Sequence, residues 1–201
     1  MIHAILPAAG KSSRMGRPKL SLSIGSSTVL GCLVATLHQA GVHSVLVVLA
    51  PGDDRLATLA SQSGAVAVHL PAPTPHMRAT VSYGLNHLLE SGMAKAGDAF
   101  MLIPADHPAL TTRSLSTLLE AIERQHGYAV YVPTFEGKRG HPVILSYSIA
   151  LQIPTLPESE GINQLIRRHE KETLQVPVDD PAILWDLDTE ADYQRLRALF
   201  T

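Results

Sequence analysis

The sequence predicts an α/β fold in which helices cover both faces of a mostly parallel sheet. Short apolar runs alternate along the chain with longer amphipathic segments, and this alternation is typical of successive βαβ units. Parallel sheets of this kind are buried on both faces, so their strands are short and apolar. The 201 residues contain no internal repeat, low-complexity tract or interdomain linker. We therefore expect a single domain that spans residues 1–201.

The elements follow from this alternation in chain order. The short apolar runs predict strands at residues 2–6, 44–49, 65–70, 99–103 and 129–133. The amphipathic segments predict helices at residues 28–40, 54–63, 79–90, 114–125, 161–169 and 190–199. Gly41 and Gly64 follow the first two helices, where C-terminal caps favour glycine. Ligands of open α/β sheets bind at the carboxyl ends of the strands, so functional residues are expected in the loops that follow them.

Bulk properties exclude several classes of function. The formal net charge is -2 with no basic block, which argues against a nucleic-acid partner held through its phosphates. The lone cysteine, Cys32, excludes an intrachain disulfide framework and is expected in the core. No apolar run approaches the length of a membrane span. Gly10 and Lys11 interrupt the first apolar run, so no signal peptide is expected and the protein is expected to be cytoplasmic.

The stretch between the first predicted strand and the first predicted helix is the most distinctive part of the chain. Residues 6–20, LPAAGKSSRMGRPKL, combine small residues with four cations. Small residues let a backbone approach a ligand, and successive N–H groups bind anions. Arg14 and Lys19 add fixed positive charge. Neither the Walker pattern nor the dinucleotide fingerprint is present, and a solvated turn is the simpler alternative. The loop nevertheless suits a polyphosphate.

Two later loops carry further candidates. Asp106 directly follows a predicted strand, where a carboxylate suits Mg²⁺ if phosphates supply other oxygens, and a turn cap before Pro108 is the alternative. Thr80 lies near a predicted helix start, where capping is favoured over a ligand contact. Residues 135–145, FEGKRGHPVIL, form a cationic loop that enters an apolar strand, and a surface hairpin is the simpler interpretation.

The last candidate segment precedes the C-terminal helix. Asp186 and Asp188 alternate with apolar residues and are therefore expected on one face of a strand end. Such carboxylates repel each other unless a cation or a donor lies between them. Thr189 is expected to cap the following helix, where Glu190 and Asp192 favour the N-terminus.

Several ordered motifs resemble those of the MobA-like nucleotidyltransferase superfamily. Residues 8–19 resemble its A-A-G-x-S-x-R-M-G-x-x-K signature, and residues 14–20 are most similar to the molybdenum cofactor cytidylyltransferase branch. Residues 76–85 resemble its G-M-x-x-S-x-x-x-G-L element, and residues 105–108 its G-D-Q-P motif. Residues 137–143 resemble G-x-R-G-H-P-V, and residues 186–193 resemble D-I-D-T-P-E-D-L.

This resemblance implies a Rossmann-like three-layer α/β/α domain of the nucleotide-diphospho-sugar transferase type. It implies transfer of CMP from CTP to a phosphorylated acceptor, molybdopterin in the most similar branch, with Mg²⁺ or Mn²⁺ as cofactor and pyrophosphate released. The implied catalytic residues are Arg14, Lys19 and Asp106. Implied nucleotide contacts are Leu6, Ala8, Ala9, Gly10, Ser12, Ser13, Arg14, Lys19, Thr80 and Gly84. Implied acceptor contacts are Arg139, Gly140, His141 and Asp186, and implied metal ligands are Asp106 and Asp188.

Departures from the family pattern keep alternatives open. Four residues differ from those usual in the family. Alanine is usual at the position of Pro7 and glycine at that of His76, while glutamine is usual at that of His107 and arginine at that of Asn163. The residues do not choose between Asp186 and Asp188 as the second metal ligand. The donor could instead be GTP or ATP, and the acceptor a sugar or alcohol phosphate. A different class of function is a non-catalytic carrier that hands a nucleotide-bearing cofactor to a molybdoenzyme or its chaperone.

Overall fold

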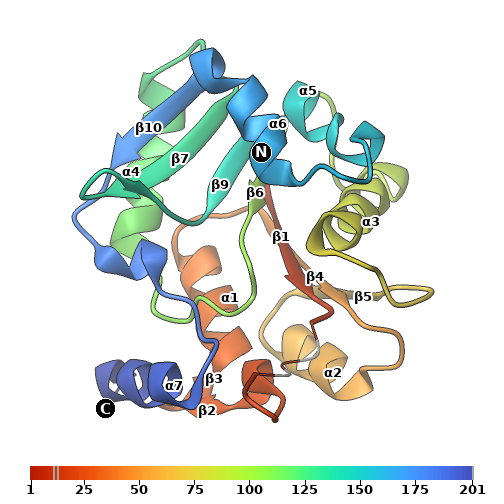
Figure 1. Ribbon diagram of the computed structural model, residues 1–201, viewed down its shortest axis with the longest axis vertical. Coiled ribbons are helices and arrows are strands. Elements are labelled where there is room, and N and C mark those ends of the chain that lie inside the picture. Colours follow the sequence, from red (N-terminus) through yellow and green to blue (C-terminus); the bar gives the residue numbers. More distant parts are fainter. Residues whose placement is uncertain (11, 13, 201) are drawn as a thin grey trace.

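A mixed, mostly parallel sheet forms the middle layer of the computed structural model, which describes residues 1–10, 12 and 14–200 (Figure 1). Its strands in spatial order are β10 (Thr173–Pro177), β7 (Val130–Phe135), β9 (Val143–Ser146), β6 (Ala99–Leu102), β1 (Ile2–Ala8), β4 (Ser44–Leu49) and β5 (Val66–His69). Among the described strands of this sheet, β9 and the short β8 (Lys138–Arg139) run in the direction opposite to the others. A small separate ribbon joins β2 (Ser23–Ile24) to β3 (Ser27–Thr28).

Helices cover both faces of this sheet, as the sequence predicts (Figure 1). They are α1 (Val29–Gln39), α2 (Asp54–Gln62), α3 (Met77–Glu90), α4 (Thr112–Arg124), α5 (Tyr147–Ala150), α6 (Ile162–Arg168) and α7 (Glu190–Arg197). Short 3-10 turns span Lys19–Ser21, Ile153–Thr155, Glu170–Glu172, Pro181–Leu184 and Ala198–Phe200. The three-layer α/β/α fold is thereby confirmed. No helix in the described part of the chain combines the length and the apolar character needed to cross a membrane.

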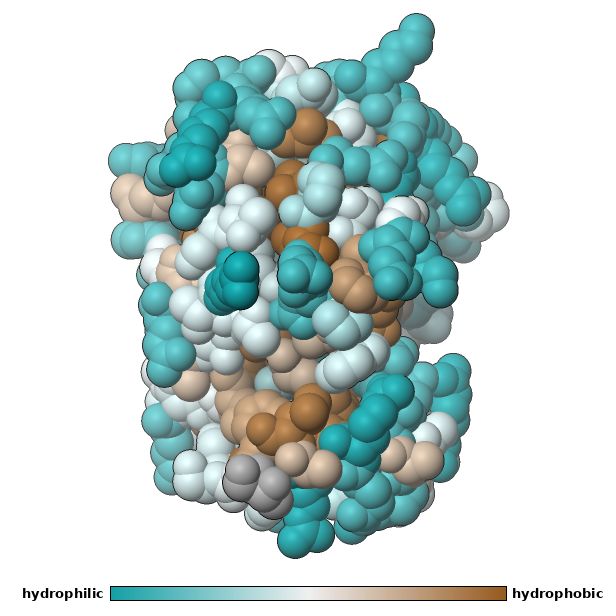
Figure 2. All heavy atoms as spheres, turned by 90° about the vertical axis from the view of Figure 1, so that its left-hand side faces the viewer, coloured by the Kyte–Doolittle hydropathy of each residue, from teal (hydrophilic) through white to brown (hydrophobic). Residues whose placement is uncertain are grey.

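The core is divided by the sheet into two apolar layers. One layer packs α1, α2, α4 and α7 against the sheet, and the other packs α3, α5 and α6 against it. Successive side chains of β1 point to opposite faces of the sheet, so Ala4 and Leu6 pack in the first layer and Ile5 packs in the second. The face that carries α4 and α7 is largely hydrophilic, with smaller apolar areas between the polar side chains (Figure 2).

The five strands and six helices predicted from the alternation of apolar and amphipathic segments are present among the described residues, with small shifts at their ends. Gly41 and Gly64 have φ of +86° and +88° directly after α1 and α2, so the predicted glycine caps are confirmed. Thr189 accepts a hydrogen bond from the backbone N–H of Asp192 and caps α7, as predicted. Cys32 is half-buried and packs against the core.

Two expectations about local structure are wrong. α3 begins at Met77 rather than at residue 79, so Thr80 lies inside the first turn and does not cap the helix. His76 occupies the cap position, and the buried Thr80 hydroxyl instead bonds the Thr74 hydroxyl at 2.7 Å. Residues 185–188 form no strand, because the 3-10 turn Pro181–Leu184 leads into an irregular segment that joins the sheet through no ladder.

Candidate active site

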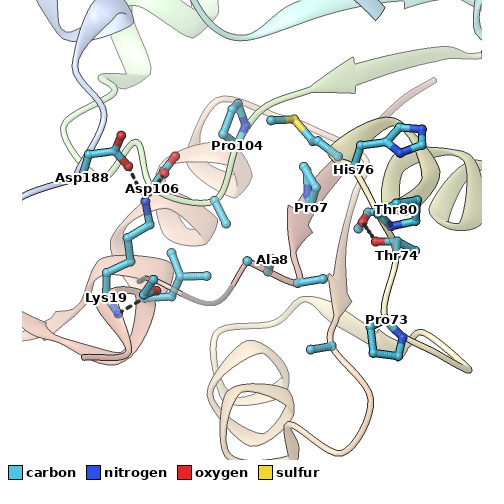
Figure 3. Close-up of a pocket in the computed structure, with 18 of the residues that line it drawn as sticks. Pro7, Ala8, Lys19, Pro73, Thr74, His76, Thr80, Pro104, Asp106 and Asp188 are labelled. Carbon is cyan, nitrogen blue, oxygen red and sulfur yellow. Dashed lines mark hydrogen bonds and ion pairs between the residues drawn. The ribbon is translucent and has the colours of Figure 1, made fainter. Parts of the chain in front are cut away.

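The carboxyl ends of the central strands open into a pocket of about 650 Å³ (Figure 3). Four loops line it, namely those after β1, β4, β5 and β6, together with Asp188 from the segment before α7. This is the edge of the sheet at which the fold predicts a ligand. The site expected from the loops therefore coincides with this cavity.

A cluster of charges lies on one side of this pocket. The Lys19 ammonium contacts Asp106 Oδ2 at 2.6 Å and Asp188 Oδ1 at 2.9 Å. Arg14 bonds the second carboxylate oxygen of Asp188. Figure 3 shows Lys19, Asp106 and Asp188 on one side of the pocket and Thr74, Thr80 and His76 on the other. The sequence separates these charges by up to 174 residues, so the fold alone brings them together.

Local structure explains why Lys19 reaches this position. Lys19 begins a 3-10 turn, and its backbone N–H donates to the Ser12 hydroxyl at 3.4 Å. Leu20 is buried beneath the turn and anchors it in the core. Gly16, at φ +64°, provides a left-handed turn between Ser12 and Lys19. The loop thus holds its lysine on a fixed base at the end of β1.

The two carboxylates are held next to each other by a backbone contact. The N–H of Leu187 donates to the Asp106 carbonyl at 3.0 Å, which fixes the following Asp188 beside the loop after β6. The Asp192 carboxylate accepts from the backbone N–H of Thr189 at 2.9 Å and so ties Asp188 to the start of α7. The hydrogen bonds that cap α7 therefore also hold the Asp188 carboxylate in position.

The cluster keeps Lys19 charged. Partial burial opposes the charge, but hydrogen bonds and charges from Asp106 and Asp188 raise the pKa of Lys19 above its ordinary value. Asp106 Oδ1 is buried and makes no hydrogen bond with any described residue. The site therefore offers a cation for an anionic ligand and a carboxylate oxygen with free lone pairs.

The residues present fit a divalent metal only in part. Asp106 and Asp188 supply hard oxygen donors, and the free Asp106 Oδ1 is available to a cation. Within the described residues, no group of three or more His, Cys, Asp or Glu side chains is arranged to hold a metal. Mg²⁺ needs few protein ligands when phosphate oxygens complete its shell, so the pair fits a metal–nucleotide complex.

A second pocket of about 380 Å³ adjoins the first and shares Met77, Pro104, Asp106 and Asp188 with it. Its other lining residues are His107, Arg139, Gly140, His141, Ile183, Leu184 and Asp186. The four residues expected to contact the acceptor thus lie together around one cavity. The shared carboxylates place that cavity directly beside the charged cluster.

The second pocket contains two buried imidazoles. The rings of His107 and His141 meet edge to face, with centroids 5.0 Å apart. Burial lowers the pKa of His141 to about 4 and also lowers the pKa of His107. Burial therefore favours the neutral form of both rings. Arg139, the cation of this pocket, forms an ion pair with Glu170.

Close packing fixes the loop that carries His141. The His141 N–H donates to the Ile183 carbonyl at 2.9 Å. A Cβ on Gly140 would collide with that same carbonyl, so only glycine allows this approach. The loop after β7 and the turn before α7 are thereby joined, and together they form one wall of the second pocket.

Several expected nucleotide contacts do line the first pocket, and others do not. Ala8, Ala9, Gly10, Ser12, Arg14, Lys19 and Thr80 line it. Leu6 does not, because its side chain is fully buried and its backbone pairs with β4. Gly84 instead permits α3 to pack on the sheet, since a Cβ there would lie 2.7 Å from Val48 Cγ2. Ser13 lies outside the described residues.

Some residues that line the first pocket are not among the site residues that the sequence predicts. Ala50 and Pro51 follow β4, and Pro73 and Thr74 follow β5. The rule that ligands bind at strand ends would have found all four. His107 departs from the family motif and also lines the second pocket.

A family model and a curated relative both match most of the chain. The family model for the MobA-like NTP transferase domain matches residues 4–173. The chain is 24% identical over 204 residues to the molybdenum cofactor cytidylyltransferase of Escherichia coli K12, covering 100% of this chain and 97% of that protein.

Solved structures show the same fold. A nucleotidyl transferase from Methanothermobacter superposes with a TM-score of 0.81 at 22% identity and covers 100% of this chain and 97% of its own. A manganese complex of a Mycobacterium tuberculosis protein superposes with a TM-score of 0.75 at 21% identity, covering 98% of each chain. The protein has the nucleotidyltransferase fold and cytidylyltransferase relatives, and the chain belongs to the MobA-like NTP transferase family.

Proposed function

We propose that this protein transfers CMP from CTP to the terminal phosphate of molybdopterin and releases pyrophosphate. The observation that carries the proposal is the position of Lys19, Asp106 and Asp188 where two pockets meet. The larger pocket has the room and the cations for a nucleoside triphosphate. The smaller pocket lies beside the same carboxylates and is suited to an acceptor.

The reaction is a displacement at phosphorus. An oxygen of the acceptor phosphate forms a bond to the α-phosphorus of CTP, and the bond from that phosphorus to the β-phosphate oxygen breaks. No protein nucleophile is needed, so the lone Cys32, half-buried in the core, has no part in it. Such a reaction depends on positioning and on neutralising charge.

The residues divide this work between them. Lys19 and Arg14 would neutralise the triphosphate and the departing pyrophosphate. Asp106 and Asp188 would hold Mg²⁺ or Mn²⁺, which when bound neutralises and orients phosphate oxygens. Thr74 and Thr80 line the opposite wall, where the base or the ribose would lie.

Support for the acceptor comes from the second pocket and from one relative. Met77, Ile183 and Leu184 give the cavity apolar surface, and two neutral imidazoles add polar edges. These groups suit a flat heterocycle next to its own phosphate. The full-length relative from Escherichia coli is named for the molybdenum cofactor. The product would then pass to a molybdoenzyme or its chaperone.

The direct test is pyrophosphate release from CTP, GTP or ATP in the presence of Mg²⁺ and molybdopterin. We expect release with CTP, and none when molybdopterin or Mg²⁺ is omitted. Pyrophosphate release with a sugar or alcohol phosphate in place of molybdopterin would refute molybdopterin as the acceptor but would still support nucleotidyl transfer. Binding of the cofactor product without any pyrophosphate release would identify a carrier and refute the enzyme.

A further inference from the structure

We infer that Lys19 occupies the place of the divalent cation in the nucleotide-free protein, so that metal enters only together with the triphosphate. The inference rests on the proposed function, since it assigns metal and triphosphate to one cluster. It adds a second role for Lys19, which is to keep the metal site closed until nucleotide arrives.

The first step of the argument is geometric. The Lys19 ammonium bridges one oxygen of Asp106 and one of Asp188, at 2.6 and 2.9 Å. Asp106 and Asp188 are also the carboxylates that would hold a divalent ion, so the ammonium group and the ion would compete for the same side chains. The side chains of Lys19 and Asp106 are only 16% and 17% exposed, so solvent screens the contact weakly.

The second step concerns the remaining carboxylate oxygens. Arg14 covers the other oxygen of Asp188. Asp106 Oδ1 is buried and accepts no hydrogen bond from a described residue, and its nearest cationic or imidazole neighbour is His107 Nε2 at 3.9 Å. Three of the four oxygens of the pair are therefore bonded to a cation of the chain. A metal ion that arrives alone finds a single free oxygen beside an ammonium group, whose like charge repels it.

The third step is the exchange that nucleotide makes possible. Lys19 and Arg14 both line the larger pocket, so a triphosphate bound there offers them new anionic partners. When they turn to the phosphates, both carboxylates become available, and phosphate oxygens complete the metal shell that two residues cannot fill. Each ligand then strengthens the binding of the other by the same factor.

A purely structural ion pair would behave differently. Removing Lys19 from such a pair would lower the stability of the protein and leave two carboxylates that repel each other. It would not increase the affinity of the protein for a metal ion. If Lys19 stands in for the metal, its removal opens a site that binds metal without nucleotide. Metal affinity in the nucleotide-free protein therefore separates the two roles.

The experiment is a titration of the full chain with Mn²⁺ alone, with free Mn²⁺ counted from its electron paramagnetic resonance signal. Wild type is compared with Lys19→Met, which keeps the length of the side chain and removes its charge. Arg17→Met is the matched control, because Arg17 belongs to the same loop but pairs with Glu190. We expect Lys19→Met to bind Mn²⁺ at least about tenfold more tightly than wild type, and Arg17→Met to match wild type.

Three results would overturn the inference. They are tight Mn²⁺ binding by wild type without nucleotide, no gain in Lys19→Met, or an equal gain in Arg17→Met. Lys19→Gln repeats the test if Lys19→Met does not fold, as judged by circular dichroism. The titration contains no CTP and no acceptor, so its outcome is independent of whether the protein transfers CMP. Failure of the transfer assay and failure of this inference are thus distinguishable.

Discussion

Asp106 is the residue on which the proposed chemistry depends most. It contacts Lys19, lines both pockets and carries the free carboxylate oxygen. We predict that Asp106→Asn lowers the rate of CMP transfer by about 100-fold or more, because the metal loses its charged ligand. Circular dichroism should show an intact fold. Asp54→Asn is the matched control, since the Asp54 side chain is 91% exposed. Near-normal turnover in Asp106→Asn would remove Asp106 from the mechanism.

His141 should make the stability of the protein depend on pH. Its pKa falls from 6.5 in the unfolded chain to about 4 in the buried pocket. Between these values the unfolded state binds the proton more readily, so acid favours unfolding. We predict that lowering the pH from about 7 to about 5 costs roughly 2 kcal/mol of unfolding free energy through this group.

Urea denaturation at both pH values measures this dependence. His141→Gln should show a smaller loss between the two pH values than wild type, whereas substitution of the exposed His38 by Gln should not change it. Asp98, whose pKa is lowered by its hydrogen bonds to the N-terminus and Lys95, loses its stabilising effect mainly as the pH falls through its ordinary pKa of 3.8, which is below this window. The same loss in His141→Gln and in wild type would show that His141 is not held neutral by burial.

At the scale of elements, the cap of α7 is expected to support both the helix and the active site. Thr189 and Asp192 form a reciprocal capping box directly after Asp188. We predict that Thr189→Ala lowers the unfolding free energy by about 1 kcal/mol and weakens CTP affinity by loosening Asp188. Thr117→Ala in the middle of α4 is the control, because that exposed hydroxyl caps nothing. Equal effects of the two substitutions in urea denaturation would contradict a capping role.

The packing of α3 on the sheet gives a second prediction for an element. A Cβ at Gly84 would lie 2.7 Å from Val48 Cγ2 and 3.0 Å from Ile5 Cγ2. We predict that Gly84→Ala destabilises the protein by about 1–3 kcal/mol while the folded fraction binds CTP normally. Asn86→Ala on the exposed face of α3 is the control. Weaker CTP binding with unchanged stability would restore Gly84 to the nucleotide site.

For the molecule as a whole, the sequence predicted the fold class well, because buried parallel strands and amphipathic helices have different apolar periods. β10 escaped prediction because this edge strand is mostly only partly buried and ends in a proline. α5 spans only Tyr147–Ala150, too short to show a helical period. The loop at residues 135–145 was expected to enter an apolar strand, which β9 (Val143–Ser146) provides, but the antiparallel pairing of this strand depends on tertiary structure.

The individual residues of the candidate site could be predicted from the sequence, but the contacts between them could not. Lys19, Asp106 and Asp188 were each suspected from their loops, but the two contacts of Lys19 join segments 87 and 169 residues apart. The structure also separates Asp188, which pairs with Lys19 and Arg14, from the exposed Asp186, which lines only the second pocket. Long-range distances of this kind are set by the packed sheet rather than by local sequence.

The central claim is that the larger pocket holds CTP with a divalent metal. The most direct measurement is the thermal unfolding midpoint with CTP, GTP, ATP or UTP, each with and without Mg²⁺. A ligand at about 100 times its Kd stabilises the folded state by about 2.7 kcal/mol, or roughly 5–10 °C for a chain of this size. We predict such a shift for CTP, enlarged by Mg²⁺, and smaller shifts for the other nucleotides. A larger shift with a purine nucleotide, or none with any nucleotide, would contradict the account.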